Sequence, residues 1–138
     1  MYKRELKKLH KVLKEFNEET ILDNKADLQK LSLLSNNVNE YFNYKLLDDY
    51  CEFLQECNGF EFNGYIIYGT NNLIEMNSVY ETISQKDYIL IGEYDVGFFA
   101  IGIKDNKCYE LDKPSGDVVK KFSSLRKMIK YIIINSTK

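Results

Sequence analysis

Three acidic residues placed four residues apart are the first candidates for a functional site in this sequence. They are Asp48, Glu52 and Glu56, and residues at this spacing lie on one face of a helix. An acidic helix face can speed the encounter with a basic protein surface and then cover that surface. The helix dipole also favours Asp48 and Asp49 at a helix start, so a solvated structural face is the alternative interpretation.

Further acids follow at the ends of the expected strands. Glu61, Glu93 and Asp95 would extend the acidic surface toward those ends. Glu93 and Asp95, taken together with Asp112, allow a second hypothesis, a hydrolase whose carboxylates act in general acid–base catalysis or bind a metal. Such acids are also common in turns and at strand edges for structural reasons. We therefore place the hydrolase below a binding role.

Aromatic residues near these acids are candidate anchors for a protein partner. Tyr65, Tyr68, Tyr94 and Phe98 stand in or beside the expected strands, and tyrosine is enriched among the residues that dominate binding energies. The alternative is that strand aromatics belong to the core. The predicted partner-binding residues are Asp48, Glu52, Glu56, Glu61, Tyr65, Glu93, Tyr94 and Asp95.

The residue types needed for most catalytic and metal sites are missing or badly spaced. The single histidine, His10, stands far from Cys51, Cys57 and Cys108, and no two cysteines form a C-x-x-C pair. This spacing disfavours a zinc site and a Ser/His/Asp or Cys/His set, and the glycines lack phosphate-binding spacing. We expect no catalytic residue, no metal and no cofactor, and reduced thiols in the cytoplasm.

Composition and charge are typical of one folded domain over residues 1–138. The chain has 138 residues, a net charge of −2, 44% hydrophobic and 29% charged residues, ordinary values for a globular fold. The net charge argues against a nucleic-acid partner. Residues 2–16 predict an amphipathic helix whose lysine-rich face we interpret as solvated, rather than as a site for nucleic acid or anionic lipid. No apolar run approaches the ~20 residues of a membrane span, so we expect no membrane partner.

The chain over residues 46–69 predicts a helix that leads into a hairpin. Apolar residues at helical spacing indicate a helix over residues 46–57. Asn58-Gly59 ends it, because glycine accepts a left-handed cap without a Cβ clash. Asn63-Gly64 then separates two β-forming runs, which is the strongest short signal of a two-residue hairpin turn.

The remaining segments complete an α+β fold. The expected elements are a short helix over 27–34, extended or irregular chain over 38–44, a short helix over 78–84, strands over 88–91, 98–103, 108–111 and 118–122, and a helix over 125–133. Ser123 or Ser124 should cap the last helix. Short consecutive strands with tight turns predict an antiparallel meander. The predicted fold class is α+β, a single domain with an antiparallel β-meander sheet packed with N-terminal, central and C-terminal helices.

Two stretches carry a family resemblance. One, residues 50–69, reads YCEFLQECNGFEFNGYIIYG, and the other, residues 88–133, reads YILIGEYDVGFFAIGIKDNKCYELDKPSGDVVKKFSSLRKMIKYII. A helix ending in Asn-Gly, a strand ending near Tyr-Gly, an Ile-Gly strand feeding an acidic turn, and a meander closed by a helix together resemble the SUKH superfamily, the Smi/Knr-type domains. The resemblance is best over residues 46–134. The chain departs from it at Leu47, where such proteins often carry proline, and at Val96-Gly97-Phe98, where many carry a Gly/Asp-rich turn.

The resemblance implies an α+β domain that is not an enzyme. Many bacterial members are immunity proteins, each of which binds and blocks a toxin domain, often a nuclease, that its own cell or a sibling delivers. Other members are eukaryotic regulatory proteins of the cell wall. The implied partner is thus a cognate toxin domain. The alternative is an intracellular protein-binding module with a regulatory or scaffold role, which could self-associate into a homo-oligomer.

Overall fold

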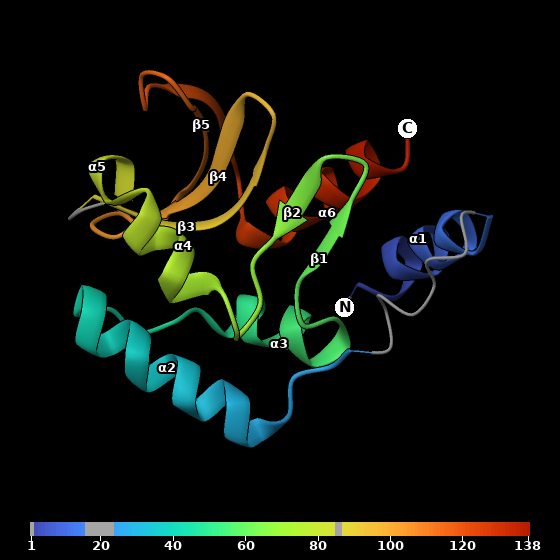
Figure 1. Ribbon diagram of the computed structural model, residues 1–138, viewed down its shortest axis with the longest axis horizontal. Helices are drawn as coiled ribbons and strands as arrows, with labels where there is room; N and C mark the ends of the chain where they lie inside the picture. Colours follow the sequence, from blue (N-terminus) through green and yellow to red (C-terminus); the bar gives the residue numbers. More distant parts are fainter. Residues whose placement is uncertain (1, 16–23, 85–86) are drawn as a thin grey trace.

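A six-stranded antiparallel sheet organises the fold and confirms the predicted meander. The computed structural model describes residues 2–15, 24–84 and 87–138 (Figure 1). Each strand pairs with the next in chain order, from β1 at one edge to β6 at the other. The strands are β1 (Phe60–Phe62), β2 (Tyr65–Ile67), β3 (Tyr88–Tyr94), β4 (Gly97–Gly102), β5 (Cys108–Asp112) and β6 (Val118–Phe122).

Helices pack on both faces of this sheet. The helices are α1 (Lys3–Glu15), α2 (Leu28–Phe42), α3 (Asp48–Glu56), α4 (Leu73–Val79), α5 (Glu81–Ser84) and α6 (Leu125–Ser136). Tyr131 of α6 contacts the ring of Phe99, whereas Tyr80 at the end of α4 contacts the ring of Phe98. Consecutive strand residues point to opposite faces, so α6 and α4 lie on opposite sides. None of the helices within the described residues is long and apolar enough to cross a membrane.

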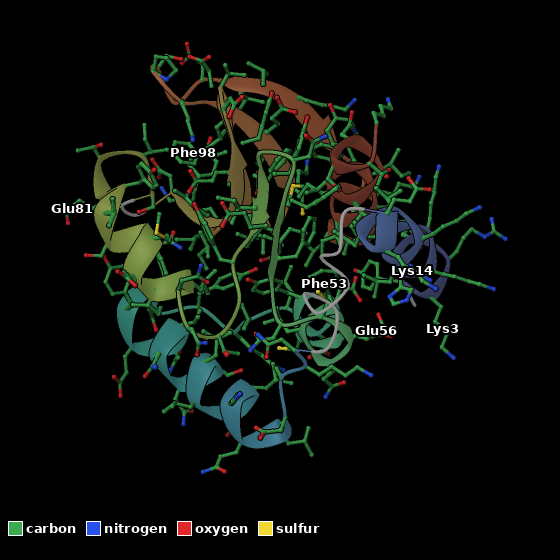
Figure 2. The ribbon with its side chains drawn as sticks, turned by 45° about the vertical axis from the view of Figure 1, so that its right-hand side comes forward. Lys3, Lys14, Phe53, Glu56, Glu81 and Phe98 are labelled. Carbon is green, nitrogen blue, oxygen red and sulfur yellow. The ribbon has the colours of Figure 1, made fainter. Side chains whose placement is uncertain are left out.

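Part of the hydrophobic core lies between the sheet and α6, and α1 and α3 also contact α6. The buried stripe of α6 consists of Leu125, Met128, Ile129, Ile132 and Ile133, as the helical spacing predicts. Both α1 and α3 contact α6; in Figure 1, α1 lies beside α6 and α3 lies at the base of the β1–β2 hairpin. Leu9 and Leu13 of α1 are fully buried, and an ion pair of 3.4 Å joins Lys130 of α6 to Glu5. Figure 2 shows Phe53 in the interior and Lys3 and Lys14 on the outer side of α1.

The helix–hairpin unit at the centre of the chain forms as predicted. Gly59 follows α3 with φ of 80°, and Asn63 and Gly64 both have positive φ in the turn between β1 and β2. A Cβ on Gly59 would lie 2.7 Å from the amide nitrogen of Gly69 and from the carbonyl of Ile67. These two backbone segments can approach each other because both lack side chains at the contact. Ser124 caps α6 by accepting a hydrogen bond from the Lys127 amide.

Two predicted helix boundaries were wrong. The segment 38–44 is not extended or irregular, because α2 continues to Phe42. Leu31, Leu34, Val38 and Phe42 form one buried helical stripe, and burying it outweighs the preference of the intervening asparagines for turns. Helix α4 starts at Leu73 rather than near residue 78, and α5 is a separate short helix. Residue 16, the end of the predicted first helix, lies outside the described residues.

Candidate functional site

The eight predicted partner-binding residues lie in three places. Asp48, Glu52 and Glu56 are on α3, which precedes the hairpin. Asp48 is exposed and the other two are half-buried. The Oε2 atom of Glu56 accepts a hydrogen bond of 3.3 Å from the amide of Tyr2. Figure 2 shows Glu56 on the side of α3 that faces α1, and Lys3, Lys7 and Lys25 line the same hollow. The basic segment therefore compensates part of this acidic face within the molecule.

Glu61 and Glu93 lie on the sheet face that α4 covers. Glu61 pairs with Ile66, Ile66 with Glu93, and Glu93 with Phe98 across the strands. Directly opposed residues share a face. Glu61 is exposed on the edge strand, whereas Glu93 is only 7% exposed.

Both carboxylate oxygens of Glu93 accept hydrogen bonds from neighbouring side chains. Lys113 Nζ donates to Oε1 at 3.0 Å, Tyr80 donates to the same oxygen at 3.4 Å, and Tyr68 donates to Oε2. Burial, together with this hydrogen bond to Glu93, raises the pKa of Tyr68. Of the four candidate anchors, Tyr68 and Phe98 follow the core alternative, because both are buried against this network and Lys113 lies over the Phe98 ring.

The acids of the hydrolase hypothesis do not converge. Glu93 is buried, Asp95 is exposed in the turn after β3, and Asp112 accepts hydrogen bonds from the backbone and hydroxyl of Ser115. Across residues 2–15, 24–84 and 87–138, no group of three or more His, Cys, Asp and Glu residues could hold a metal ion. The three cysteines are free thiols; Cys57 and Cys108 are buried and Cys51 is half-buried.

The structure brings Tyr65 and Tyr94 together on the opposite face, which is the face of α6. Their rings stack with centroids 5.0 Å apart and planes within 5°. The Tyr94 ring lies 5.5 Å from that of Phe99, which contacts Tyr131, and Tyr131 contacts Phe122 at 5.2 Å. We call Tyr65, Tyr94, Phe99, Phe122 and Tyr131 the tyrosine cluster. All except Phe99 are half-buried, so their rings reach both the core and solvent.

A backbone feature holds Tyr94 in place. Gly97 is opposite Tyr94 in the β3–β4 pair, and a Cβ on Gly97 would lie 2.7 Å from Cε1 of the Tyr94 ring. The missing side chain lets the ring lie across β4 toward β5. There the Tyr94 hydroxyl donates a hydrogen bond of 2.6 Å to Oε2 of Glu110. Asp95 follows in the turn, with Oδ1 3.5 Å from where a Cβ on Gly64 would be, so the two hairpin turns are adjacent.

Glu110 lies among the tyrosines and was absent from the predicted set. It is 7% exposed and stands between Phe99 on β4 and Lys120 on β6. Burial raises the pKa of Tyr94, and the hydrogen bond to Glu110 adds to the shift. Burial, followed by the charge of Glu110, likewise raises the pKa values of Tyr65 and Tyr131. The sequence did contain a signal for the placement of Glu110. It stands two residues after Cys108 in the same strand, so the two side chains point to the same face of the sheet.

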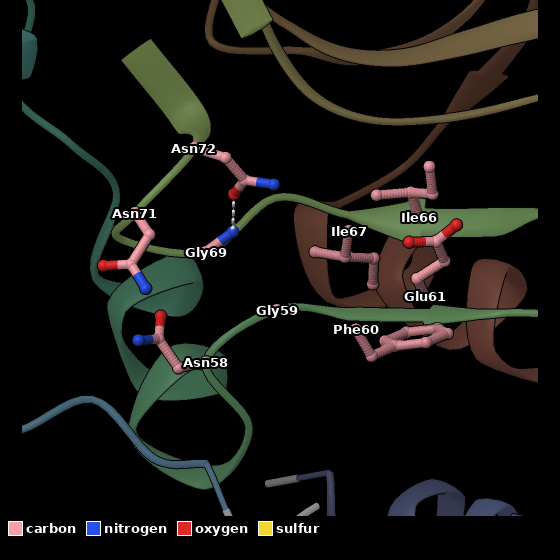
Figure 3. A pocket seen from close by; sticks show the side chains of 9 residues that line it. All are labelled: Asn58, Gly59, Phe60, Glu61, Ile66, Ile67, Gly69, Asn71 and Asn72. Atoms are coloured by element: carbon pink, nitrogen blue, oxygen red, sulfur yellow. Dashed lines mark hydrogen bonds between the residues drawn. The ribbon is translucent and has the colours of Figure 1, made fainter. Parts of the chain in front are cut away.

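A hollow of about 270 Å³ lies at the base of the β1–β2 hairpin (Figure 3). Asn58 exchanges hydrogen bonds with Thr70 through both ends of its amide, at 2.8 Å each. Asn72 accepts one from the amide of Gly69, which Figure 3 marks. These contacts join the end of α3 to the end of β2 and engage the side-chain amides of Asn58 and Asn72.

Comparison with protein-family models and with curated proteins found no match to this chain.

Proposed function

We propose that this chain is a non-enzymatic, immunity-type protein that binds a cognate toxin domain and blocks its active site or substrate surface. Two things support the proposal. One is the resemblance of residues 50–69 and 88–133 to SUKH domains, whose helix–hairpin–meander–helix order is also the order of elements in this fold. The other, which carries the proposal, is the half-exposed stack of Tyr65 and Tyr94 beside the exposed Asp95.

This stack has the physical properties of a binding anchor. The ring of Tyr94 is held by its hydrogen bond to Glu110 and by packing against the backbone of Gly97, which has no side chain there. Tyr65 is held by stacking on Tyr94. A partner therefore meets rings whose rotamers are already fixed, so little conformational entropy is lost on binding. Rigid tyrosines within a charged rim are typical of the residues that dominate interface energies.

The acidic residues contribute to the proposal unequally. Asp48, Glu61 and Asp95 are exposed and can attract a basic toxin surface from a distance. Glu52 and Glu56 are half-buried, and we expect a smaller contribution from them. We assign Glu93 to the stability of the sheet, because its partners Lys113, Tyr68 and Tyr80 take up its carboxylate.

The test is co-expression of the tagged chain with the genes that neighbour it, followed by capture and a growth assay. We expect one toxin-like domain to bind with nanomolar affinity and its toxicity to be relieved. Tyr65→Ala should weaken binding by about 30-fold or more, as expected for an interface anchor. Tyr41→Ala is the matched control, because Tyr41 is 45% exposed on α2, away from the tyrosine cluster. Capture of only host proteins or of the chain itself would contradict the proposal.

A further inference from the structure

The two buried glutamates of the sheet differ in one respect that bears on binding. Glu93 and Glu110 are each 7% exposed and lie on opposite faces. Glu93 has an ion pair with Lys113 and two tyrosine donors. Among the residues that the structure describes, Glu110 has the Tyr94 hydroxyl as its one hydrogen-bond donor and no ion pair. Buried carboxylates are normally paired, because removing a charge from water is expensive.

One oxygen of Glu110 has no partner among the described residues and is not completely sealed from solvent. Tyr94 occupies Oε2, and Oε1 accepts no hydrogen bond within the described part of the chain. Among those residues, the hydroxyl oxygen of Tyr2 is the one side-chain polar atom that is both sealed from solvent and without a partner. The Oε1 atom of Glu110 therefore keeps contact with solvent and can accept a donor from outside the molecule.

The rings around Glu110 already attract a cation. Lys120 is directly opposite Glu110 in the β5–β6 pair, yet it forms no ion pair with that carboxylate. Its Nζ lies 4.5 Å from the centre of the Tyr131 ring and 5.7 Å from that of Phe122. Lys120 is exposed, so it can move aside at little energetic expense.

We propose that Glu110 and the tyrosine cluster form a receptor for an arginine side chain of the protein partner. The guanidinium would stack on the tyrosine rings and donate to Oε1 of Glu110, displacing Lys120. Arginine fits better than lysine, because its planar group stacks on aromatic faces and is more weakly hydrated. The inference rests on the proposed function, in that the arginine would belong to the toxin domain, and it names the group that this surface recognises.

A small probe tests the site without the toxin. N-acetylarginine methylamide is titrated into the whole protein while the ring signals of Tyr65, Tyr94 and Tyr131 are followed by NMR. We expect saturable shifts, with binding at least about tenfold weaker for the uncharged citrulline analogue and for Glu110→Gln, since a bond to a charged group is lost. Lys120→Gln should tighten binding about two- to fivefold by removing the resident cation. Equal shifts with the citrulline probe, or tighter binding of the lysine probe, would overturn the assignment.

Two variants separate a binding role from a folding role. Glu110→Gln keeps the size of the side chain and the hydrogen bond from Tyr94, so it should fold. Tyr41→Phe, on α2 and outside the tyrosine cluster, is the matched control and should bind the arginine probe as the wild type does. Loss of probe binding in folded Tyr41→Phe would count against the proposed geometry.

The same variants separate this inference from the proposed function. If the toxin domain binds wild type and Glu110→Gln equally, the arginine receptor is wrong and toxin binding stands. If the arginine probe binds but no toxin domain is found, the receptor stands and the proposed function fails. If the arginine probe and a toxin domain both bind, and Glu110→Gln weakens the toxin complex at least about tenfold, then the receptor and the proposed function are both supported.

Discussion

Replacing each buried glutamate by glutamine should change stability in opposite directions. Glu93→Gln removes the negative charge that Lys113 contacts at 3.0 Å and leaves this lysine uncompensated beside the core. Glu110→Gln removes a buried charge that has no ion pair among the described residues. The glutamine at position 110 can still accept the hydrogen bond from Tyr94.

The burial of each group sets the size of the effect. Truncating one member of a buried ion pair costs about 3–5 kcal/mol. The side chains of Glu93 and Lys113 are 10% and 25% exposed, and water can reach the lysine, so we expect a loss of about 2 kcal/mol for Glu93→Gln. For Glu110→Gln we expect a gain between zero and about 1 kcal/mol, because an uncompensated buried charge is removed. For a domain of this size these values correspond to shifts in Tm of about −7 °C and up to about +4 °C.

Urea unfolding at pH 7, followed by circular dichroism, measures both variants. The double variant Glu93→Gln, Lys113→Met is the control: it removes both charges and should recover about half or more of the loss in Glu93→Gln. If Glu93→Gln and Glu110→Gln change the free energy of unfolding by the same amount within about 0.5 kcal/mol, then the contrast between a paired and an unpaired carboxylate is wrong.

Three further perturbations follow from the geometry. Asn77→Ala should destabilise the fold by about 3 kcal/mol in urea unfolding, because the buried amide of Asn77 bonds both the N–H and the C=O of Leu90 at 2.8 Å; a loss below about 1 kcal/mol would contradict this. Gly97→Ala should displace the Tyr94 ring, weaken the hydrogen bond to Glu110 and lower stability by about 1–2 kcal/mol, and an unchanged Tyr94 ring spectrum would refute it. Burial raises the pKa of Cys57 from 9.0 to about 12; since the folded-state pKa is the higher one, stability should be full below pH 9 and fall as the pH rises toward 12. Urea midpoints between pH 8 and 11 would show this fall, and Cys57→Ala should make it shallower.

Local signals explain which parts of the fold could be predicted. Asn58-Gly59 and Asn63-Gly64 require backbone conformations that few other residues adopt, so the helix end and the hairpin could be read directly from the chain. The C-terminal helix had both a serine cap and a clear apolar stripe. Helix α2 was predicted too short, because its second half has weak intrinsic propensity and is helical to bury Val38 and Phe42.

The site needed tertiary information that spacing does not contain. Alternation along β3 and β5 indicates which face Glu93 and Glu110 occupy. It does not reveal that Lys113, 20 residues away, reaches Glu93, or that no lysine pairs with Glu110 in the described residues. The stack of Tyr65 on Tyr94 depends on the register between β2 and β3, which are separated by two helices. Both tyrosines were candidates from the sequence. Their stacking, and the hydrogen bond from Tyr94 to Glu110, could be seen only in the structure.

Calorimetric titration of this protein with the toxin domain encoded beside it tests the proposed function most directly. We expect one-to-one binding with nanomolar affinity, relief of toxicity in the same stoichiometry, and an affinity that falls at least about 30-fold in Tyr65→Ala. No measurable binding by folded wild-type protein, or equal affinity of the wild type and Tyr65→Ala, would contradict it.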